Sequence, residues 1–249
     1  MASRKHRLDQ ELVDQGFFAS RDDALRSVMA GDVSTSDRRL TSAGEQVSPG
    51  IELHVRGHLP YVGRGGLKLE HGLRELGVDP TGLTCLDVGC STGGFTDCLL
   101  RHGAAQVTAV DVGYAQFDWS LRQDARVTLF ERTNVTDLPA LTDTRFDLAV
   151  CDVSFTSVVT ILPAVVELLL PGGRFLTLVK PQFEAAREDV GAGGVVRDEA
   201  VRLQALERVR EAFVEQGLEP LGSCESPITG HKGNVEYLLL GRLRESASL

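Results

Sequence analysis

Glycines stand at three points of a turn that could hold a ligand close to the backbone. Residues 85–96 of this 249-residue chain read CLDVGCSTGGFT, an apolar run followed by Gly89, Gly93 and Gly94. Glycine lets the backbone turn tightly and approach a ligand where a side chain would intervene. A helix expected from Phe95 would direct its first N–H groups into the same crevice. The spacing Gly-x-x-x-Gly-Gly differs from the Gly-x-Gly-x-x-Gly of dinucleotide sites, which disfavours a dinucleotide-dependent oxidoreductase.

Polar residues follow four other predicted strands. Asp111 ends one of them, where a carboxylate can accept hydrogen bonds from two ribose hydroxyls. Asn134 follows the next, where it either meets an adenine edge or serves as an ordinary turn residue. Asp152 and Lys180 follow two more, and the apolar run 175–179 before Lys180 predicts a half-buried lysine. Burial and a neighbouring cation lower the pKa of a lysine, so Lys180 is a candidate general base.

The elements that must position these residues alternate between helices and strands. In chain order we expect a helix at 67–76, a strand at 84–88, a helix at 95–102, a strand at 107–110, a helix at 115–122, strands at 127–130 and 146–151, a helix at 158–170, a strand at 174–179, a helix at 199–216 and strands at 222–226 and 235–240. This alternation predicts an α/β fold with a doubly wound, Rossmann-like and mostly parallel sheet. Ligands of such sheets bind at the carboxyl ends of the strands, where all of these polar residues are expected.

The first 58 residues predict a separate, small α+β domain. Its expected elements are a helix over 8–13 closed by Gly16, a helix opened by the capping box 20–23 and closed by Gly31, and strands near Val33 and over 51–55. Residues 59–66, which hold Pro60 and three glycines, are expected to form a linker. Residues 67–249 then form the larger domain.

Composition narrows the class of protein. The net charge of −9 argues against a broadly basic nucleic-acid binder, so any RNA surface must be a local basic patch. The chain has no apolar run of the ~18 residues that a membrane span needs, and its first residues lack the apolar core of a signal peptide. Five cysteines without paired spacing disfavour a zinc site or a disulfide framework and fit a reducing cytoplasm.

The N-terminal domain resembles the alpha-L RNA-binding motif of a small-subunit ribosomal protein, pseudouridine synthases and tyrosyl-tRNA synthetases. The matching pattern is Arg7-Leu-Asp9…Leu12-Val13…Gly16…Ser20-Arg21…Ala24…Gly31…Val33. It departs from the motif at 33–38, where VSTSDR replaces the usual Val-x-Val-Asn-Gly turn. The alternative is an accessory helical cap without a ligand. The RNA-binding residues that the resemblance and the local basic residues imply are Arg4, Lys5, Arg7, Ser20, Arg21 and Arg64.

The larger domain resembles a methyltransferase. A strand-borne Asp87 followed by the glycine turn is similar to the nucleoside-binding turn of S-adenosylmethionine-dependent enzymes. The turn after Asp152 lacks the two prolines that are typical of enzymes acting on exocyclic base nitrogens. Eight motifs in order extend the resemblance over nearly the whole chain: YVGRGGLKL (61–69), LDVGCSTGGFT (86–96), DVGY (111–114), ERTN (131–134), DVSF (152–155), LVKPQFE (178–184), GGVVRD (193–198) and GNVEY (233–237).

These motifs resemble the TlyA, or haemolysin A, family of ribosomal RNA 2′-O-methyltransferases with an FtsJ-like catalytic domain. The resemblance implies S-adenosylmethionine as the cofactor and ribosomal RNA within ribosomal subunits as the partner. The implied cofactor-binding residues are Asp87, Gly89, Ser91, Thr92, Gly93, Gly94, Phe95, Asp111, Val112, Asn134 and Asp152. The implied reaction is methylation of a cytidine ribose by a cytoplasmic monomer that uses no metal.

The family's Lys-Asp-Lys-Glu constellation maps onto Lys68, Asp152, Lys180 and Glu236. A ribose hydroxyl is a poor nucleophile, so its proton must be removed while the oxygen is aligned with the methyl group. The expected base is Lys180, with Asp152 orienting it. Lys68 is expected to lower the pKa of Lys180 and stabilise alkoxide charge, and Glu236 to hold Lys68 or the ribose.

Two functions of other classes compete with this interpretation. An RNA-binding ribosome-assembly factor could carry the same fold without catalysis, but the four catalytic positions are all present. A membrane-active haemolysin would need a spanning segment or a basic amphipathic helix, and the sequence shows neither.

Overall fold

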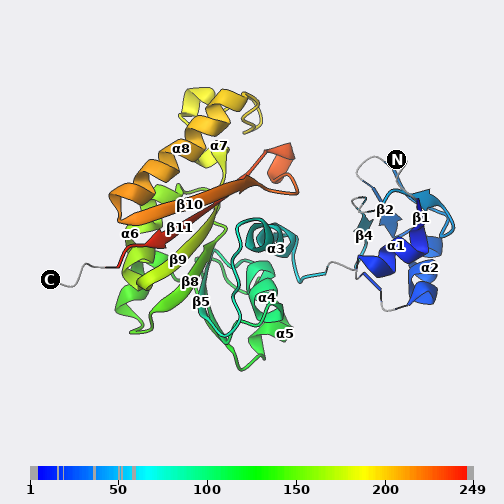
Figure 1. The fold of residues 1–249 in the computed structure, drawn as a ribbon, viewed down its shortest axis with the longest axis horizontal. Helices are drawn as coiled ribbons and strands as arrows, with labels where there is room; N and C mark the ends of the chain where they lie inside the picture. The colour runs from blue at the N-terminus through cyan, green and yellow to red at the C-terminus, as the bar shows by residue number, and fades with distance from the viewer. Residues whose placement is uncertain are drawn as a thin grey trace. The chain divides into compact units, whose positions relative to one another are not determined.

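The computed structural model divides into two compact units, Met1–Pro60 and Tyr61–Leu249 (Figure 1). It describes residues 5–15, 17–18, 20–35, 38–49, 51, 53–57 and 60–245. Each unit has a hydrophobic core of its own. Within the described residues, no helix is long and apolar enough to cross a membrane.

The N-terminal unit combines two helices with two short antiparallel strand pairs. Its elements are β1 (His6–Arg7), α1 (Leu8–Asp14), α2 (Arg21–Ala30), β2 (Val33–Ser34), β3 (Gln46–Val47) and β4 (His54–Val55). β1 pairs with β3 and β2 pairs with β4. The capping of α2 is as predicted, because the Ser20 side chain accepts the Asp23 N–H and Gly31 ends the helix with a φ of 77°. Gly16, the predicted end of the first helix, lies outside the described residues.

A seven-stranded sheet forms the centre of the larger unit. Its strands are β5 (Thr84–Val88), β6 (Gln106–Asp111), β7 (Val127–Glu131), β8 (Phe146–Cys151), β9 (Leu169–Val179), β10 (Leu218–Glu225) and β11 (Tyr237–Leu243). The order is β10-β11-β9-β8-β5-β6-β7, and only the pairings of β11 with β9 and β10 are antiparallel within this sheet. The predicted doubly wound sheet is confirmed. Its topological switch point, where ligands of such sheets bind, lies between β5 and β8.

Helices cover both faces of the sheet (Figure 1). The elements are α3 (Gly65–Glu75), α4 (Gly94–Arg101), α5 (Trp119–Arg122), η1 (Val135–Ala140), α6 (Val158–Leu168), α7 (Pro181–Glu184), η2 (Arg187–Asp189), α8 (Glu199–Glu215) and η3 (His231–Gly233). Side chains of α3, α4 and α5 share one core cluster with the strands. Those of η1, α6 and α8 share the other. The sheet is therefore buried on both sides, as its apolar strands require.

Two predicted helices are too long. The helix expected over 115–122 begins only at Trp119, because Ala115 has a left-handed φ of 59° and the Asp118 side chain caps the helix by accepting the Ser120 N–H. The helix expected over 158–170 ends at Leu168, since the next residue is already extended and opens β9.

The predicted linker over 59–66 is also too long. Tyr61 is buried in the core of the larger unit, and its ring leaves no room for a side chain at Gly66, where a Cβ would lie 2.2 Å from Tyr61 Cγ. The Val62 N–H donates to Asp97 Oδ2 at 3.0 Å. Residues 61–66 therefore belong to the larger unit, and α3 begins at Gly65.

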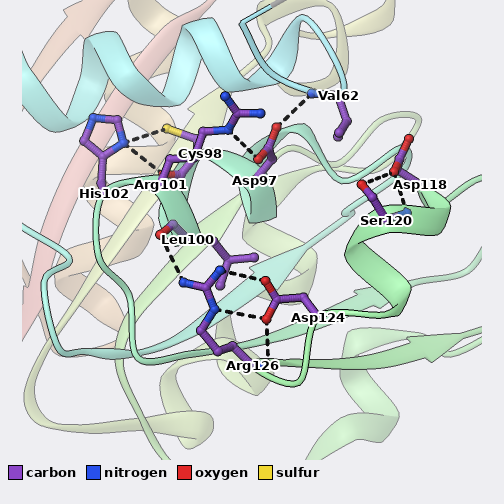
Figure 2. Close-up of polar contacts among 10 residues, drawn as sticks. All are labelled: Val62, Asp97, Cys98, Leu100, Arg101, His102, Asp118, Ser120, Asp124 and Arg126. Carbon is purple, nitrogen blue, oxygen red and sulfur yellow. Dashed lines mark hydrogen bonds and ion pairs between the residues drawn. The ribbon is translucent and has the colours of Figure 1, made fainter.

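Asp97, in the first turn of α4, connects the segment 61–64 before α3 to α4 (Figure 2). One carboxylate oxygen accepts the Val62 N–H, and the other accepts Arg101 Nε at 2.7 Å. Arg101 also lies over the Tyr61 ring, 5.5 Å from its centroid. A single buried carboxylate thus fixes the start of α3 against α4.

We expect Asp97→Ala to destabilise the larger unit by about 1–3 kcal/mol, because it leaves the partly buried Val62 N–H without its acceptor and removes the partner of Arg101. Denaturant unfolding of the full chain measures this. The control is Asp124→Ala, which removes a partly exposed pair with Arg126 (Figure 2) and is expected to cost less than about 1 kcal/mol. Equal losses for the two variants would contradict the anchoring role.

Candidate active site

The glycine turn after β5 packs directly against the end of β8. Gly89, Ser91 and Gly93 have φ angles of 77°, 47° and 97°, in the left-handed region that favours glycine. A Cβ at Gly89 would lie 2.9 Å from the Asp152 carbonyl oxygen. The Asp152 N–H in turn donates to the Val88 carbonyl at 3.0 Å. The turn is therefore packed against the carboxyl ends of both central strands, β5 and β8, at the switch point.

Asp111 is held in place by backbone donors. Its Oδ2 accepts the Ser91 N–H at 2.8 Å and its Oδ1 accepts the Gly113 N–H at 2.6 Å. A carboxylate fixed in this way can present its remaining lone pairs to a ribose diol. Asn134 caps η1, because its side-chain oxygen accepts the Thr136 N–H at 3.1 Å. The turn role of Asn134 is confirmed, and the residue lines the adjoining cleft as well.

A cleft of about 480 Å³ opens at the carboxyl ends of the strands. Six of the predicted cofactor-binding residues line it: Gly89, Ser91, Asp111, Val112, Asn134 and Asp152. A smaller cavity of about 180 Å³ shares Gly89, Ser91 and Asp152 with it. The smaller cavity is also lined by the predicted residues Thr92, Gly94 and Phe95, and by Lys180. The candidate base therefore opens onto space that adjoins the cleft.

Asp87 and Gly93 are not among the residues that line either cavity. Asp87 is fully buried and accepts a hydrogen bond from Thr96 Oγ1 at 2.6 Å, so it links β5 to α4. Burial, with repulsion from Asp152, raises the pKa of Asp87 to about 7. Gly93 is the N-cap of α4, where a Cβ would lie 2.5 Å from a Leu121 methyl carbon. The structure gives both residues positions that support the turn.

Two ion pairs with nearly buried lysines lie at the same edge of the sheet, and the Asp152 side chain is 22% exposed. Lys180 Nζ, at the end of β9, lies 2.6 Å from Asp152 Oδ1 and donates to Ser154 Oγ at 2.9 Å. Lys68 Nζ, on α3, donates to Glu236 Oε2 at 2.5 Å. The lysine side chains are only 9% and 10% exposed. All four predicted catalytic residues are thus paired with one another.

Strand register and helix packing bring the two pairs together. Tyr237 of β11 lies opposite Val179 of β9, so Glu236 and Lys180 are the next residues along two adjacent strands. Gly65 stands one helical turn before Lys68, and a Cβ there would lie 3.7 Å from Asp152 Oδ2. The geometry therefore places two ammonium groups and two carboxylates around one small region.

The predicted RNA-binding residues fall into two groups. Arg7 and Arg21 both pair with the buried Asp9, at 2.7 and 3.0 Å, and the hydrogen bond from Arg7 holds the pKa of Asp9 below its usual value. Their side chains remain about half exposed. Ser20 Oγ donates to Asp23, while Lys5 is exposed.

The remaining two predicted RNA-binding residues are Arg64 and Arg4. Arg64 belongs to the larger unit, where it donates to the Thr229 carbonyl at 3.0 Å. Arg4 lies outside the described residues.

One group of possible metal ligands occurs among the described residues, and it belongs to the N-terminal unit. His6 Nδ1 lies 2.9 Å from Glu11 and 3.7 Å from Asp14. The carboxylates also accept hydrogen bonds from glutamine side chains of α1 and its C-cap. These contacts describe a local hydrogen-bond network.

Sequence reasoning missed three residues around the ion pairs. Ser154 holds Lys180, and Glu184 binds the start of α6 from the segment after Lys180. Phe155 is 92% exposed at the cleft rim with a φ of 64°, and its ring centroid lies 5.4 Å from that of Phe183. All of them lie in the DVSF and LVKPQFE motifs, but their residue types alone do not indicate a chemical role at these positions.

Comparisons with known proteins identify the family. The model of the FtsJ-like methyltransferases matches residues 61–243. The chain belongs to this family. The protein YqxC of Bacillus subtilis is 48% identical over 242 residues, which cover 96% of this chain and 86% of YqxC. TlyA of Mycobacterium tuberculosis, a 16S/23S rRNA (cytidine-2′-O)-methyltransferase, is 41% identical over 250 residues, or 99% of this chain and 93% of TlyA.

Solved structures agree with this assignment. A haemolysin-like protein from Streptococcus thermophilus matches 98% of this chain and 90% of its own, with 42% identity and a TM-score of 0.75. A methyltransferase from Listeria monocytogenes matches 74% of this chain with a TM-score of 0.55 at 17% identity, which reflects the shared fold. The predicted family and fold are confirmed, and the chain is an FtsJ-like methyltransferase.

Buried Asp87 predicts a specific pH dependence of stability. Its folded-state pKa of about 7 lies above the usual value, so the folded chain holds this proton more tightly than the unfolded chain does. The stability that this group contributes is present in acid and is lost as the pH rises through 7. The difference between the usual pKa of 3.8 and the folded-state pKa of about 7 corresponds to about 4 kcal/mol of folding free energy. Asp87→Asn should therefore become progressively more stable relative to the parent between pH 5 and 8, as measured by urea unfolding. A difference that does not vary with pH would contradict the assignment.

Proposed function

We propose that the protein transfers a methyl group from S-adenosylmethionine to the 2′-hydroxyl of a cytidine ribose in ribosomal RNA. The proposal rests on two ion pairs, Lys180 with Asp152 and Lys68 with Glu236. Lys180 and Asp152 line the smaller cavity, which adjoins the cleft. Transfer to a hydroxyl oxygen needs a proton acceptor and a group that stabilises developing negative charge. The two lysines can supply these functions.

The chemistry of the cleft fits a nucleoside cofactor. Asp111, oriented by two backbone N–H groups, suits a ribose diol, and Val112, Val135 and Ile161 offer apolar walls for a purine ring beside the Asn134 amide. When bound, S-adenosylmethionine supplies a methyl group on a cationic sulfonium, which is electrophilic enough to need no metal ion. The smaller cavity beside Lys180 would then receive the acceptor ribose.

The four charged residues have distinct tasks in this proposal. Lys180 first releases its own proton to solvent, and the neutral amine at Nζ then takes up the proton of the 2′-hydroxyl. Asp152, 2.6 Å away, stabilises the ammonium group that results, and Ser154 fixes the amine from a second direction. Lys68 stabilises the developing alkoxide, and Glu236 holds Lys68 in place.

The choice of substrate rests on the relatives and on the N-terminal unit. The name of the Mycobacterium tuberculosis relative states cytidine-2′-O-methylation of 16S and 23S rRNA. The half-exposed guanidinium groups of Arg7 and Arg21 converge on Asp9, which gives the N-terminal unit a locally basic point that could contact phosphate. We therefore propose that the protein acts on ribosomal RNA within ribosomal subunits.

Lys180→Ala tests the proposal directly. We expect methyl transfer from tritiated S-adenosylmethionine to unmethylated ribosomal subunits to fall about 10²–10⁴-fold, the usual contribution of a general base. Cofactor affinity, measured by calorimetry, should change little. The control is Lys232→Ala, at an exposed lysine. Full turnover by Lys180→Ala would refute the mechanism, and a parent protein that binds subunits without methylating them would be an assembly factor instead.

Substituting both Arg7 and Arg21 with Gln tests the RNA surface. Glutamine keeps a hydrogen-bond donor for Asp9 while removing the charge. Each lost phosphate contact should reduce the slope of log affinity against log salt by about 1, so the double variant should lose about 2. Filter binding to ribosomal subunits at several salt concentrations measures the slope, with Arg26→Gln on α2 as the control. An unchanged slope would place the RNA contacts elsewhere.

A further inference from the structure

Two chain segments that leave neighbouring parallel strands are joined by a series of side-chain contacts. Residues 152–158 follow β8, and residues 180–184 follow β9. The series begins with the contacts of Lys180 to Asp152 and Ser154. It continues with the Phe155 and Phe183 rings and ends with Glu184, which binds Ser157 and Val158. The contacts follow the same order along both segments.

Glu184 closes this series with both carboxylate oxygens. Ser157 Oγ donates to Oε2 at 2.6 Å, and the Val158 N–H donates to Oε1 at 2.7 Å. The side chain is nearly inaccessible, with 2% of the residue exposed. The Glu184 carbonyl accepts Arg208 Nη1 of α8 at 2.9 Å, which fixes the backbone behind the carboxylate.

The environment of Glu184 is unusual for a carboxylate. Both donors to its side chain are uncharged, and burial raises the pKa of Glu184. The contact of the neighbouring cation, Arg208, is with the Glu184 backbone carbonyl. Burying a carboxylate is costly, so stability alone gives little reason to keep it. Glu184 is not among the residues that line the cleft or the smaller cavity. Its effect must therefore pass through the residues that it holds.

The segment between the two anchors is conformationally strained. Phe155 has a left-handed φ of 64° although it is not glycine, and its ring is 92% exposed, so burial does not hold it. Such a conformation persists only where the surroundings impose it. The contact of Ser154 with Lys180 lies on one side of Phe155, and the contacts of Glu184 with Ser157 and Val158 lie on the other.

We propose that Glu184 is a positioning residue for methyl transfer: by anchoring the start of α6, it fixes Asp152 and Ser154 against Lys180. This inference rests on the proposed function, in which Lys180 receives the proton. A purely structural role predicts something different. Glu184 would then act only as a cap of α6, and its loss would lower stability without changing the catalytic rate of the folded protein.

The test compares Glu184→Ala and Glu184→Gln in the full chain, using tritiated S-adenosylmethionine and unmethylated ribosomal subunits. A displacement of about 1 Å can cost about 10²-fold in rate, so Glu184→Ala should lower kcat by at least about tenfold. KM for the subunits and the calorimetric Kd for the cofactor should stay within about twofold. Glu184→Gln can still accept the Val158 N–H and donate to Ser157 Oγ, and should recover most of kcat.

Two further variants keep the outcome interpretable. Ser157→Ala removes one of the two contacts, together with the N-cap hydrogen bond from the Val159 N–H. It should lower kcat less than Glu184→Ala does, and it serves as the second test if Glu184→Ala folds poorly. Glu188→Ala removes an exposed carboxylate on η2 and should match the parent. Thermal unfolding of each variant establishes the temperature at which it is fully folded for assay.

The outcomes separate the two proposals. A parent protein without methyl transfer would refute the proposed function. An active parent with unchanged kcat for folded Glu184→Ala and Ser157→Ala would refute the positioning role alone. Equal losses in Glu184→Ala and Glu184→Gln would also refute it, since the hydrogen-bond pattern would then not be what matters.

Discussion

The site depends on keeping two lysines and two carboxylates together at the edge of an apolar sheet, where water has little access. Each lysine has its carboxylate within 2.6 Å, and removing one partner of a buried pair strands the other charge at considerable cost. The four residues come from α3, from the ends of β8 and β9 and from the approach to β11. Correct assembly of the sheet is therefore a precondition for satisfying any of these charges.

Close backbone approach is what makes the arrangement possible. A side chain at Gly230 would place its Cβ 1.9 Å from Glu236 Oε1, and one at Gly89 would meet the backbone of Asp152. The third such point is Gly94, where a Cβ would lie 3.0 Å from the Gly66 nitrogen. Small residues at these points let α3, the glycine turn and the strand ends crowd around the charges.

The sequence was most informative where local pattern and function coincide. Alternating helices and strands predicted the sheet, and strand ends predicted Asp111 and Lys180 at one edge. Local pattern cannot show that Tyr61 packs against Gly66, so the predicted linker includes residues that belong to the larger unit. It also could not separate Asp87, whose side chain points into the protein, from the residues that line the cleft.

The position of β11 between β9 and β10 has a consequence for biosynthesis. Glu236 precedes this strand, and β11 is the last strand of the sheet along the chain. A nascent polypeptide that has emerged only as far as α8 holds Lys68, Asp152 and Lys180 but lacks the carboxylate that pairs with Lys68. Its charge network is completed only when the final strand has inserted beside β9, so a chain truncated after α8 would keep Lys68 without its carboxylate partner.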